Sequence, residues 1–159
     1  MTQPGPSGAP AGIDLLALDM QFCFALYSAS HAMTRTYKPL LERLGLTYPQ
    51  YLVMLVLWER DAQLVKDIGA RLFLDSGTLT PLLKRLEAAG LLLRQRDPQD
   101  ERQVRISLSA EGKALRQDAQ AIPEQVLCAS GQGVGELGRL RAALAAVRAD
   151  LLKALDEGP

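Results

Sequence analysis

The chain has 159 residues, of which 48% are hydrophobic and 23% charged, a composition typical of one folded domain with a core of its own. Its formal net charge is zero, which argues against a protein that coats nucleic acid without selectivity. A specific DNA-binding protein stays open, because it needs basic residues only on one face. The longest unbroken apolar run, 51–58, is too short to span a membrane. We therefore expect a cytoplasmic protein with no membrane partner.

The N-terminal part of the chain divides into a tail and a long helix. Residues 1–12 are rich in Pro and Gly and lack the basic start and apolar centre of a signal peptide, so a disordered tail is expected. Residues 13–37 are predicted to form a helix that is apolar around nearly its whole circumference, and a partner subunit is the natural cover for it. Pro39 is expected to kink or break this helix, and Gly45 to cap the short helical turn that follows.

A run of helices followed by a charged hairpin is predicted in the middle of the chain. In the hairpin, Val104, Ile106 and Leu108 alternate with polar residues, which places one face inward and the other outward. Short helix, turn, helix and hairpin outline a winged helix-turn-helix, so the sequence predicts a mainly α fold with a small β-hairpin wing. The elements are a helix that begins at Thr47 or Tyr48 with Pro49 in its first turn, a helix over 64–72, a turn at 73–74, a helix from Asp75 or Ser76 to Ala89, and a hairpin over 91–108.

The C-terminal third is predicted to be helical with two interruptions. Ser109 caps a helix that runs to about Ala121, Pro123 interrupts it, and the glycine-rich stretch 130–138 forms a loose turn. The last helix carries apolar residues spaced three and four apart, as in a coiled coil, although a helix packed on its own domain shows the same spacing. Because the N-terminal helix also lacks cover, we favour a homodimer built from both chain ends. The seam consists of Leu137, Leu140, Leu144, Val147 and Leu151.

The helix that begins at Asp75 or Ser76 is the candidate recognition helix. Its leucines form the inward stripe, which leaves hydroxyl groups for phosphate and base-edge contacts and cations for neutralising phosphates. Arg102 lies at the hairpin turn and is expected to enter a minor groove. Asp100 is expected to hold Arg102 or Arg105 by a charge-assisted hydrogen bond, and the alternative is that these loop charges only contact solvent. The predicted DNA-binding residues are Ser76, Gly77, Thr78, Thr80, Pro81, Lys84, Arg85, Asp100, Arg102 and Arg105.

Several segments between about Leu18 and Gly112 resemble a known family. The hairpin and the helix start after it resemble those of the MarR family of dimeric winged-helix regulators, and the other segments resemble the OhrR repressors, which sense organic hydroperoxides. This resemblance implies a single MarR-type domain over 13–159, in which 46–112 bind DNA while 13–45 and 113–159 form the dimer. The segments are 97–102 with Arg105, and 108–112, for the family, and 21–27, 46–54 and 74–86 for the OhrR branch.

Cys23 lies in the segment that resembles the sensing cysteine of OhrR proteins, although a lone cysteine is more often an ordinary core residue. A sensor needs a stabilised thiolate, because the thiolate attacks the peroxide. The resemblance implies that Tyr37 and Tyr48 of one protomer hydrogen-bond the Cys23 sulfur of the other, and ordinary packing is the alternative. Tyr37 cannot reach Cys23 within its own helix, because fourteen positions separate them, roughly 21 Å. By resemblance Cys128, in a segment expected to be mobile, resolves oxidised Cys23 as an intersubunit disulfide, and a small cellular thiol is the alternative.

The resemblance thus implies a homodimeric repressor that binds an inverted-repeat operator in double-stranded DNA and releases it when an organic hydroperoxide oxidises Cys23. A MarR-type regulator switched by noncovalent binding of a small aromatic ligand is the alternative. A third candidate is an enzyme, a thiol peroxidase that consumes peroxide through Cys23, but the chain has no segment that resembles the peroxidase motifs. No cofactor is expected, and His31 with two widely separated cysteines is too small a set for a metal site.

Overall fold

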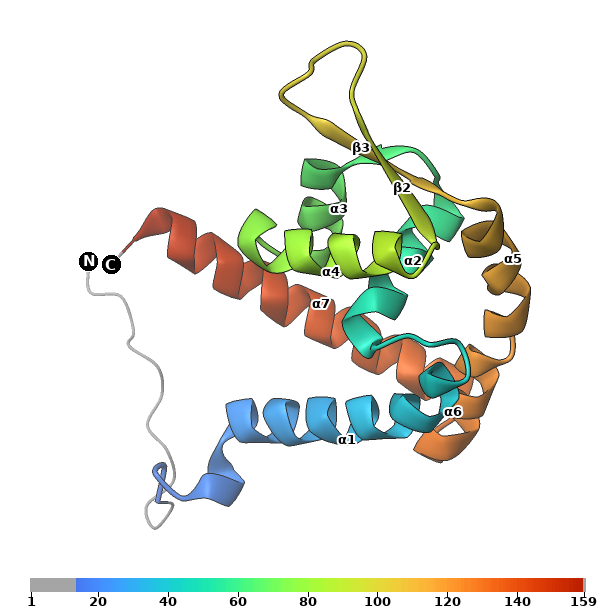
Figure 1. Ribbon diagram of the computed structural model, residues 1–159. Helices are drawn as coiled ribbons and strands as arrows, with labels where there is room; N and C mark the ends of the chain where they lie inside the picture. Colours follow the sequence, from blue (N-terminus) through green and yellow to red (C-terminus); the bar gives the residue numbers. More distant parts are fainter. Residues whose placement is uncertain (1–13, 159) are drawn as a thin grey trace. The chain divides into compact units, whose positions relative to one another are not determined.

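The computed structural model describes residues 14–158, which form two compact units, one before Thr36 and one from Thr36 onward. The fold is mainly helical with a small antiparallel sheet, as predicted (Figure 1). The predicted tail over 1–12 lies outside the described residues. The elements are the 3-10 helix η1 (Leu18–Met20), α1 (Phe22–Glu42), α2 (Tyr48–Glu59), β1 (Gln63–Leu64), α3 (Val65–Leu72), α4 (Ser76–Ala88), β2 (Leu92–Arg96), β3 (Val104–Leu108), α5 (Ala110–Ala119), α6 (Ile122–Ser130) and α7 (Val134–Glu157).

Both predicted bounds of the first long helix were wrong. A 3-10 turn and the extended residue Gln21 precede α1, and the Gln21 side-chain amide donates to the carbonyls of Leu15 and Ala17. These bonds satisfy backbone acceptors that a continuous helix would otherwise have used. The helix then continues through Pro39 to Glu42. A proline removes only one backbone N–H, and the hydrogen bonds of the neighbouring turns remain. Gly45, at a φ of 67°, closes the turn that follows, as predicted.

The winged helix-turn-helix is built around a three-stranded sheet in the order β1-β3-β2. The sequence prediction missed β1 (Gln63–Leu64), because it took Leu64 as the first residue of the next helix and gave Gln63 to no element. The β2–β3 hairpin projects beyond the helices (Figure 1). Its inner face and the inner face of α4 are buried together, and each fully buried leucine stabilises the fold by about 1.5–3 kcal/mol. The residues of these two faces are Leu79, Leu83 and Leu86 on α4 and Leu92, Ile106 and Leu108 on the strands.

The C-terminal helices differ from the predicted interruptions. Pro123 lies in the first turn of α6, where its missing N–H has no helical partner to lose, so it starts a new helix. The loop after α6 is short, since Gly131 ends α6 at a φ of 66° and α7 begins at Val134. The predicted turn over 130–138 was therefore too long. A helix of 24 residues rich in Ala and Leu accommodates the glycines in its first turns.

Large apolar side chains are exposed at both ends of the single chain, whereas the buried core comes from residues 41–126. On α7 the exposed fraction reaches 77% at Leu155, far above the values of core leucines. Among the helices that the structure describes, none is long and apolar enough to cross a membrane. The exposed apolar residues are Leu15, Leu16, Leu18, Met20, Phe22, Leu26 and Met33 near the N-terminus and Val134, Leu140, Leu144, Leu151, Leu152 and Leu155 on α7.

Two helical glycines provide a matched test of the packing. A Cβ on Gly112 would overlap the Leu91 backbone, at 3.1 Å from its carbonyl carbon and closer to its oxygen, whereas a Cβ on Gly135 meets nothing within 4 Å. We expect Gly112→Ala to destabilise the fold by about 1–3 kcal/mol through overpacking. Gly135→Ala should instead stabilise it by about 0.5–1 kcal/mol. Denaturant unfolding measures both, and equal effects at the two positions would contradict the close approach at Gly112.

Candidate nucleic-acid interface and thiol site

The helix-turn-helix depends on the tight link between α3 and α4. Phe73 ends α3 in the left-handed region, at φ 55° and ψ 38°. The Leu74 N–H then donates to the Gly69 carbonyl at 3.0 Å, and a Cβ on Gly69 would lie 2.8 Å from the Leu74 oxygen. Asp75 begins α4 by accepting a hydrogen bond from the Thr78 N–H at 2.8 Å. The predicted turn and cap are confirmed, and they fix the direction in which α4 leaves α3.

The outward face of α4 carries the residues predicted to meet DNA. Ser76, Gly77, Thr78, Pro81, Lys84 and Arg85 are exposed, and Thr80 is half-buried. The Thr78 hydroxyl also donates to the Asp75 carboxylate at 3.2 Å, so this side chain is shared with the cap. The hydrogen bond from the Thr78 N–H is the main cause that lowers the pKa of Asp75. Asp75 therefore stays ionised and keeps the first turn of α4 in place.

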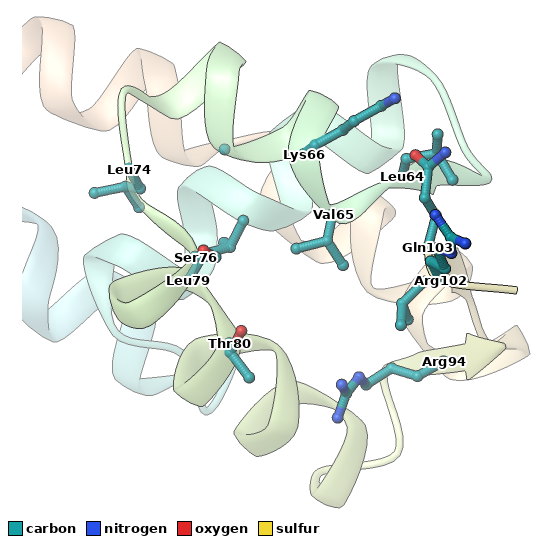
Figure 2. Close-up of a pocket in the computed structure, with 12 residues that line it drawn as sticks. Leu64, Val65, Lys66, Leu74, Ser76, Leu79, Thr80, Arg94, Arg102 and Gln103 are labelled. Atoms are coloured by element: carbon teal, nitrogen blue, oxygen red, sulfur yellow. The ribbon is translucent and has the colours of Figure 1, made fainter. Parts of the chain in front are cut away.

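A hollow of about 470 Å³ lies between the two helices and the wing. Figure 2 shows Lys66 of α3, Thr80 of α4 and Arg94 of β2 around it, with Arg102 and Gln103 of the wing turn at one side. Its remaining lining is mostly apolar and includes Leu64, Val65, Leu74, Leu79 and Val104. Cations from α3, β2 and the wing turn thus surround a single concave surface. This arrangement suits a phosphodiester strand, which requires several cations in a row.

Lys66, Arg94 and Gln103 were missed by the sequence prediction. Arg94 could have been found, because strand alternation puts it on the same face as the buried Leu92, two positions earlier. Its terminal nitrogen lies 3.6 Å from the Glu87 carboxylate. Arg94 Nε and Gln103 Oε1 are buried atoms without a hydrogen-bond partner among residues 14–158. Of the two, Arg94 Nε is a donor that a phosphate oxygen could satisfy.

The acidic residues of the wing were assigned to the wrong ion pair. Asp97, not Asp100, pairs with Arg105, with 2.5 Å between Arg105 Nη2 and Asp97 Oδ2. The register explains this, because the Asp97 N–H donates to the Gln103 carbonyl, and alternation places Arg105 on the same face two positions on. Arg105 also donates to the Ala62 carbonyl at 2.5 Å, so it holds the wing to the connection between α2 and β1. Asp100 instead accepts from the Arg102 backbone N–H at 3.1 Å and from the Gln103 amide.

The wing aspartates are held in their ionised form. The pKa of Asp97 is lowered, first by the hydrogen bond from the Gln99 backbone N–H and also by Arg105. The pKa of Asp100 is lowered, first by the hydrogen bond from the Gln103 side chain and to a lesser degree by the charge of Lys66. Asp97 is buried with only 3% of its surface exposed, whereas Arg102 is exposed at the turn. Asp97 therefore organises the wing from inside, while Arg102 lies exposed at the turn and lines the hollow.

The two cysteines are free thiols and both are exposed. Cys23 is the second residue of α1, in a first turn that contains no acidic side chain. Cys128 lies inside α6, the segment that the sequence predicted to be mobile. Each thiol is on the surface of a regular helix and accessible to a reactant.

The structure brings the two predicted tyrosines together. The ring centroids of Tyr37 on α1 and Tyr48 on α2 lie 4.8 Å apart, and the buried Tyr51 packs 5.8 Å from Tyr37. Burial, followed by the nearby Tyr48, raises the pKa of Tyr37 to about 12, and burial also raises the pKa of Tyr48. Both phenols therefore stay protonated at neutral pH and can donate hydrogen bonds. Cys23 belongs to the unit before Thr36, whereas both tyrosines belong to the unit that follows.

Comparisons with known proteins decide the family. A family model described as transcriptional regulator SarA/Rot matches residues 35–119. The organic hydroperoxide resistance transcriptional regulator of Bacillus subtilis is 50% identical over 131 residues, which cover 82% of this chain and 89% of the relative. The chain belongs to the MarR family, in its OhrR branch. These relatives are transcriptional regulators, so the comparisons favour DNA binding over an enzyme.

Solved structures of a MarR-type regulator, AbfR of Staphylococcus epidermidis, match most of the chain. Reduced AbfR bound to DNA has a TM-score of 0.70 and 36% identity, covering 86% of this chain and 96% of AbfR. Disulfide-formed AbfR has a TM-score of 0.58 and 36% identity, covering 82% and 91%. The residues described here contain no group of three His, Cys, Asp or Glu side chains that could hold a metal ion.

The hollow generates a prediction about salt dependence. We expect Arg94→Ala and Arg102→Ala each to weaken binding to a duplex from the upstream region of the gene. Each lost phosphate contact should reduce the slope of log K against log salt by about 0.9. Arg139→Ala is the control, because Arg139 lies on α7 and pairs with Glu136. Fluorescence anisotropy between 50 and 200 mM salt, roughly the range over which such contacts are visible, measures the slopes. An unchanged slope for both wing variants would contradict a phosphate site.

The wing aspartates generate a prediction about pH. Since the pKa values of Asp97 and Asp100 are lowered, their stabilisation is present above the ordinary aspartate pKa of about 4 and is lost as the pH falls through the lowered values. Asp97→Asn should therefore have a smaller free energy of unfolding than the parent at pH 7. This difference in unfolding free energy should become smaller as the pH falls. Urea unfolding from pH 7 to 3 tests this, with Asp118→Asn at an exposed position on α5 as control. A difference in unfolding free energy that stays constant from pH 7 to 3 would refute a stabilising role for the ionised Asp97 carboxylate.

Proposed function

We propose that this protein is a homodimeric repressor that binds operator DNA when reduced and releases it when an organic hydroperoxide oxidises Cys23. The observation that carries the proposal is the exposed Cys23 in the first turn of α1, in a chain half identical to a regulator of organic hydroperoxide resistance. The paired tyrosines, which stay protonated, supply hydrogen-bond donors suited to a thiolate.

DNA is bound through the winged helix-turn-helix over 46–112. The outward residues of α4 enter the major groove, Arg102 enters the minor groove, and Lys66 and Arg94 contact the backbone between them. Arg105 contributes by holding the wing through Asp97 and the Ala62 carbonyl. The exposed apolar residues of 13–45 and 113–159 support a dimer, because a homodimer would cover them and would match an inverted-repeat operator.

The chemistry proceeds in two steps. The Cys23 thiolate attacks the outer oxygen of the hydroperoxide, which breaks the O–O bond, oxidises the sulfur to sulfenic acid and releases the alcohol after protonation. The Cys128 thiol of the partner subunit then attacks this sulfur, and a disulfide forms with loss of water. Tyr37 and Tyr48 orient the thiolate before oxidation and lose that partner afterward. The accessible positions of both thiols on helix surfaces support this sequence.

Oxidation releases DNA by changing the spacing of the two recognition helices. In such dimers these helices sit about 34 Å apart to reach successive turns of one duplex face, so a small rotation prevents simultaneous binding. AbfR, a similar protein, has been solved both reduced on DNA and in a disulfide-formed state, so a protein similar to this chain takes up both redox states.

The proposal predicts reversible loss of DNA binding. Reduced protein is titrated with a labelled upstream duplex, then receives one equivalent of cumene hydroperoxide and finally a thiol reductant. Anisotropy should fall with the hydroperoxide and recover with the reductant, and Cys23→Ser should abolish the response. Cys128→Ser should still be oxidised, but without forming a dimer crosslinked by an intersubunit disulfide in non-reducing electrophoresis. Binding that ignores complete oxidation of Cys23 would overturn the proposal and favour a noncovalent aromatic ligand.

A further inference from the structure

The first turn of α5 is fixed to the end of the recognition helix. The Ser109 N–H donates to the Leu91 carbonyl at 3.0 Å, and its hydroxyl donates to the Gly90 carbonyl at 2.6 Å. Gly112 packs directly on the Leu91 backbone, where no Cβ would fit. The Leu91 N–H in turn donates to Leu86 within α4 at 3.0 Å. We call Gly90, Leu91, Ser109 and Gly112 the α4–α5 joint, because α4, the wing strand β2 and α5 meet there.

Trp58 connects this joint to α2. Its indole Nε1 donates to the Gly112 carbonyl oxygen at 2.8 Å, a bond that joins residues 54 positions apart and is partly buried. An indole nitrogen donates only, so this carbonyl fixes the orientation of the ring. Because Gly112 cannot move closer to Leu91, a shift of Trp58 has to move the joint or break the hydrogen bond.

On its other side, Trp58 ends a row of packed rings. Tyr51 meets Trp58 edge-on with 6.3 Å between ring centroids, and it lies 5.8 Å from Tyr37 and 6.5 Å from Tyr48. Tyr51 is only 2% exposed. Protein interiors are packed about as densely as organic crystals, so a displaced ring moves its neighbours rather than entering empty space. We call Tyr37, Tyr48, Tyr51 and Trp58 the aromatic row.

We propose that Trp58 is a positioning residue that passes a rearrangement of Tyr37 and Tyr48 to the α4–α5 joint. This inference rests on the proposed function, because it takes the two tyrosines as the groups that move when Cys23 is oxidised. Tyr51 transmits the movement, and the indole N–H of Trp58 carries it to Gly112. The joint then moves as one body and carries α4 and α5 with it, which changes the spacing of the two recognition helices.

The test replaces Trp58 with Phe, which keeps an aromatic ring in the row but removes the N–H donor. Gln63→Met is the matched control, because the Gln63 amide also donates to backbone carbonyls of α2, those of Val56 and Arg60, outside the aromatic row. Binding of the upstream duplex is measured before and after one equivalent of cumene hydroperoxide, and free Cys23 thiol is counted in parallel. Trp58→Phe should bind DNA when reduced and should be oxidised at Cys23, yet its ratio of oxidised to reduced Kd should be roughly tenfold smaller than in the parent.

A spectroscopic readout separates transmission from simple stability. Trp58 is the only tryptophan, so emission from the parent reports its surroundings directly. The emission should change with the same hydroperoxide stoichiometry as DNA release, and Cys23→Ser should show no change. Unchanged emission during release, or full release by Trp58→Phe, would overturn the role of Trp58 and leave the proposed function intact. Failure of the parent and of Gln63→Met to release DNA would overturn both.

Discussion

The close approach of Gly112 to the Leu91 backbone is the contact on which the DNA-binding part of the molecule depends. Only a glycine fits there, and the Ser109 cap adds hydrogen bonds to Gly90 and Leu91 on the same side. The carboxylate of Asp61 contributes as well, because it accepts from the Leu108 N–H at 2.9 Å. Helix α5 therefore leaves the winged helix in a fixed direction. The first turn of α5 is therefore tied to the end of α4 by direct contacts.

A second constraint explains how a chain with zero net charge presents a surface for DNA. The wing contains several acidic residues, but Asp97 is buried against Arg105, and Asp100 is bound to backbone and side-chain donors of the turn. Their charges stabilise the wing instead of facing outward. The cations that line the hollow, Lys66, Arg94 and Arg102, come from separate elements. Local arrangement, rather than total charge, gives the surface its sign.

Features set by local sequence were predictable, and features set by register were not. The caps at Asp75 and Ser109, the turn at Gly45 and the alternation of Ile106 and Leu108 follow from short-range chemistry, and the structure has them. The pairing of Asp97 with Arg105 depends on which strand residues face each other, so the nearer Asp100 was wrongly preferred. The two residues of β1 form a strand only because β3 lies beside them, and the hollow needs α3, α4 and the wing together.

The positions of Tyr37 and Cys23 on one helix also follow from the fold. Tyr37 lies on α1, as Cys23 does, yet it packs on Tyr48 and Tyr51 of α2. Fourteen positions of helix separate it from Cys23, roughly 21 Å, which no hydrogen bond spans. If these tyrosines bind the thiolate, the sulfur has to come from the partner subunit. The site made by the thiol and the two tyrosines would then be complete only in the dimer. Its oxidation would act on the interface that sets the spacing of the recognition helices.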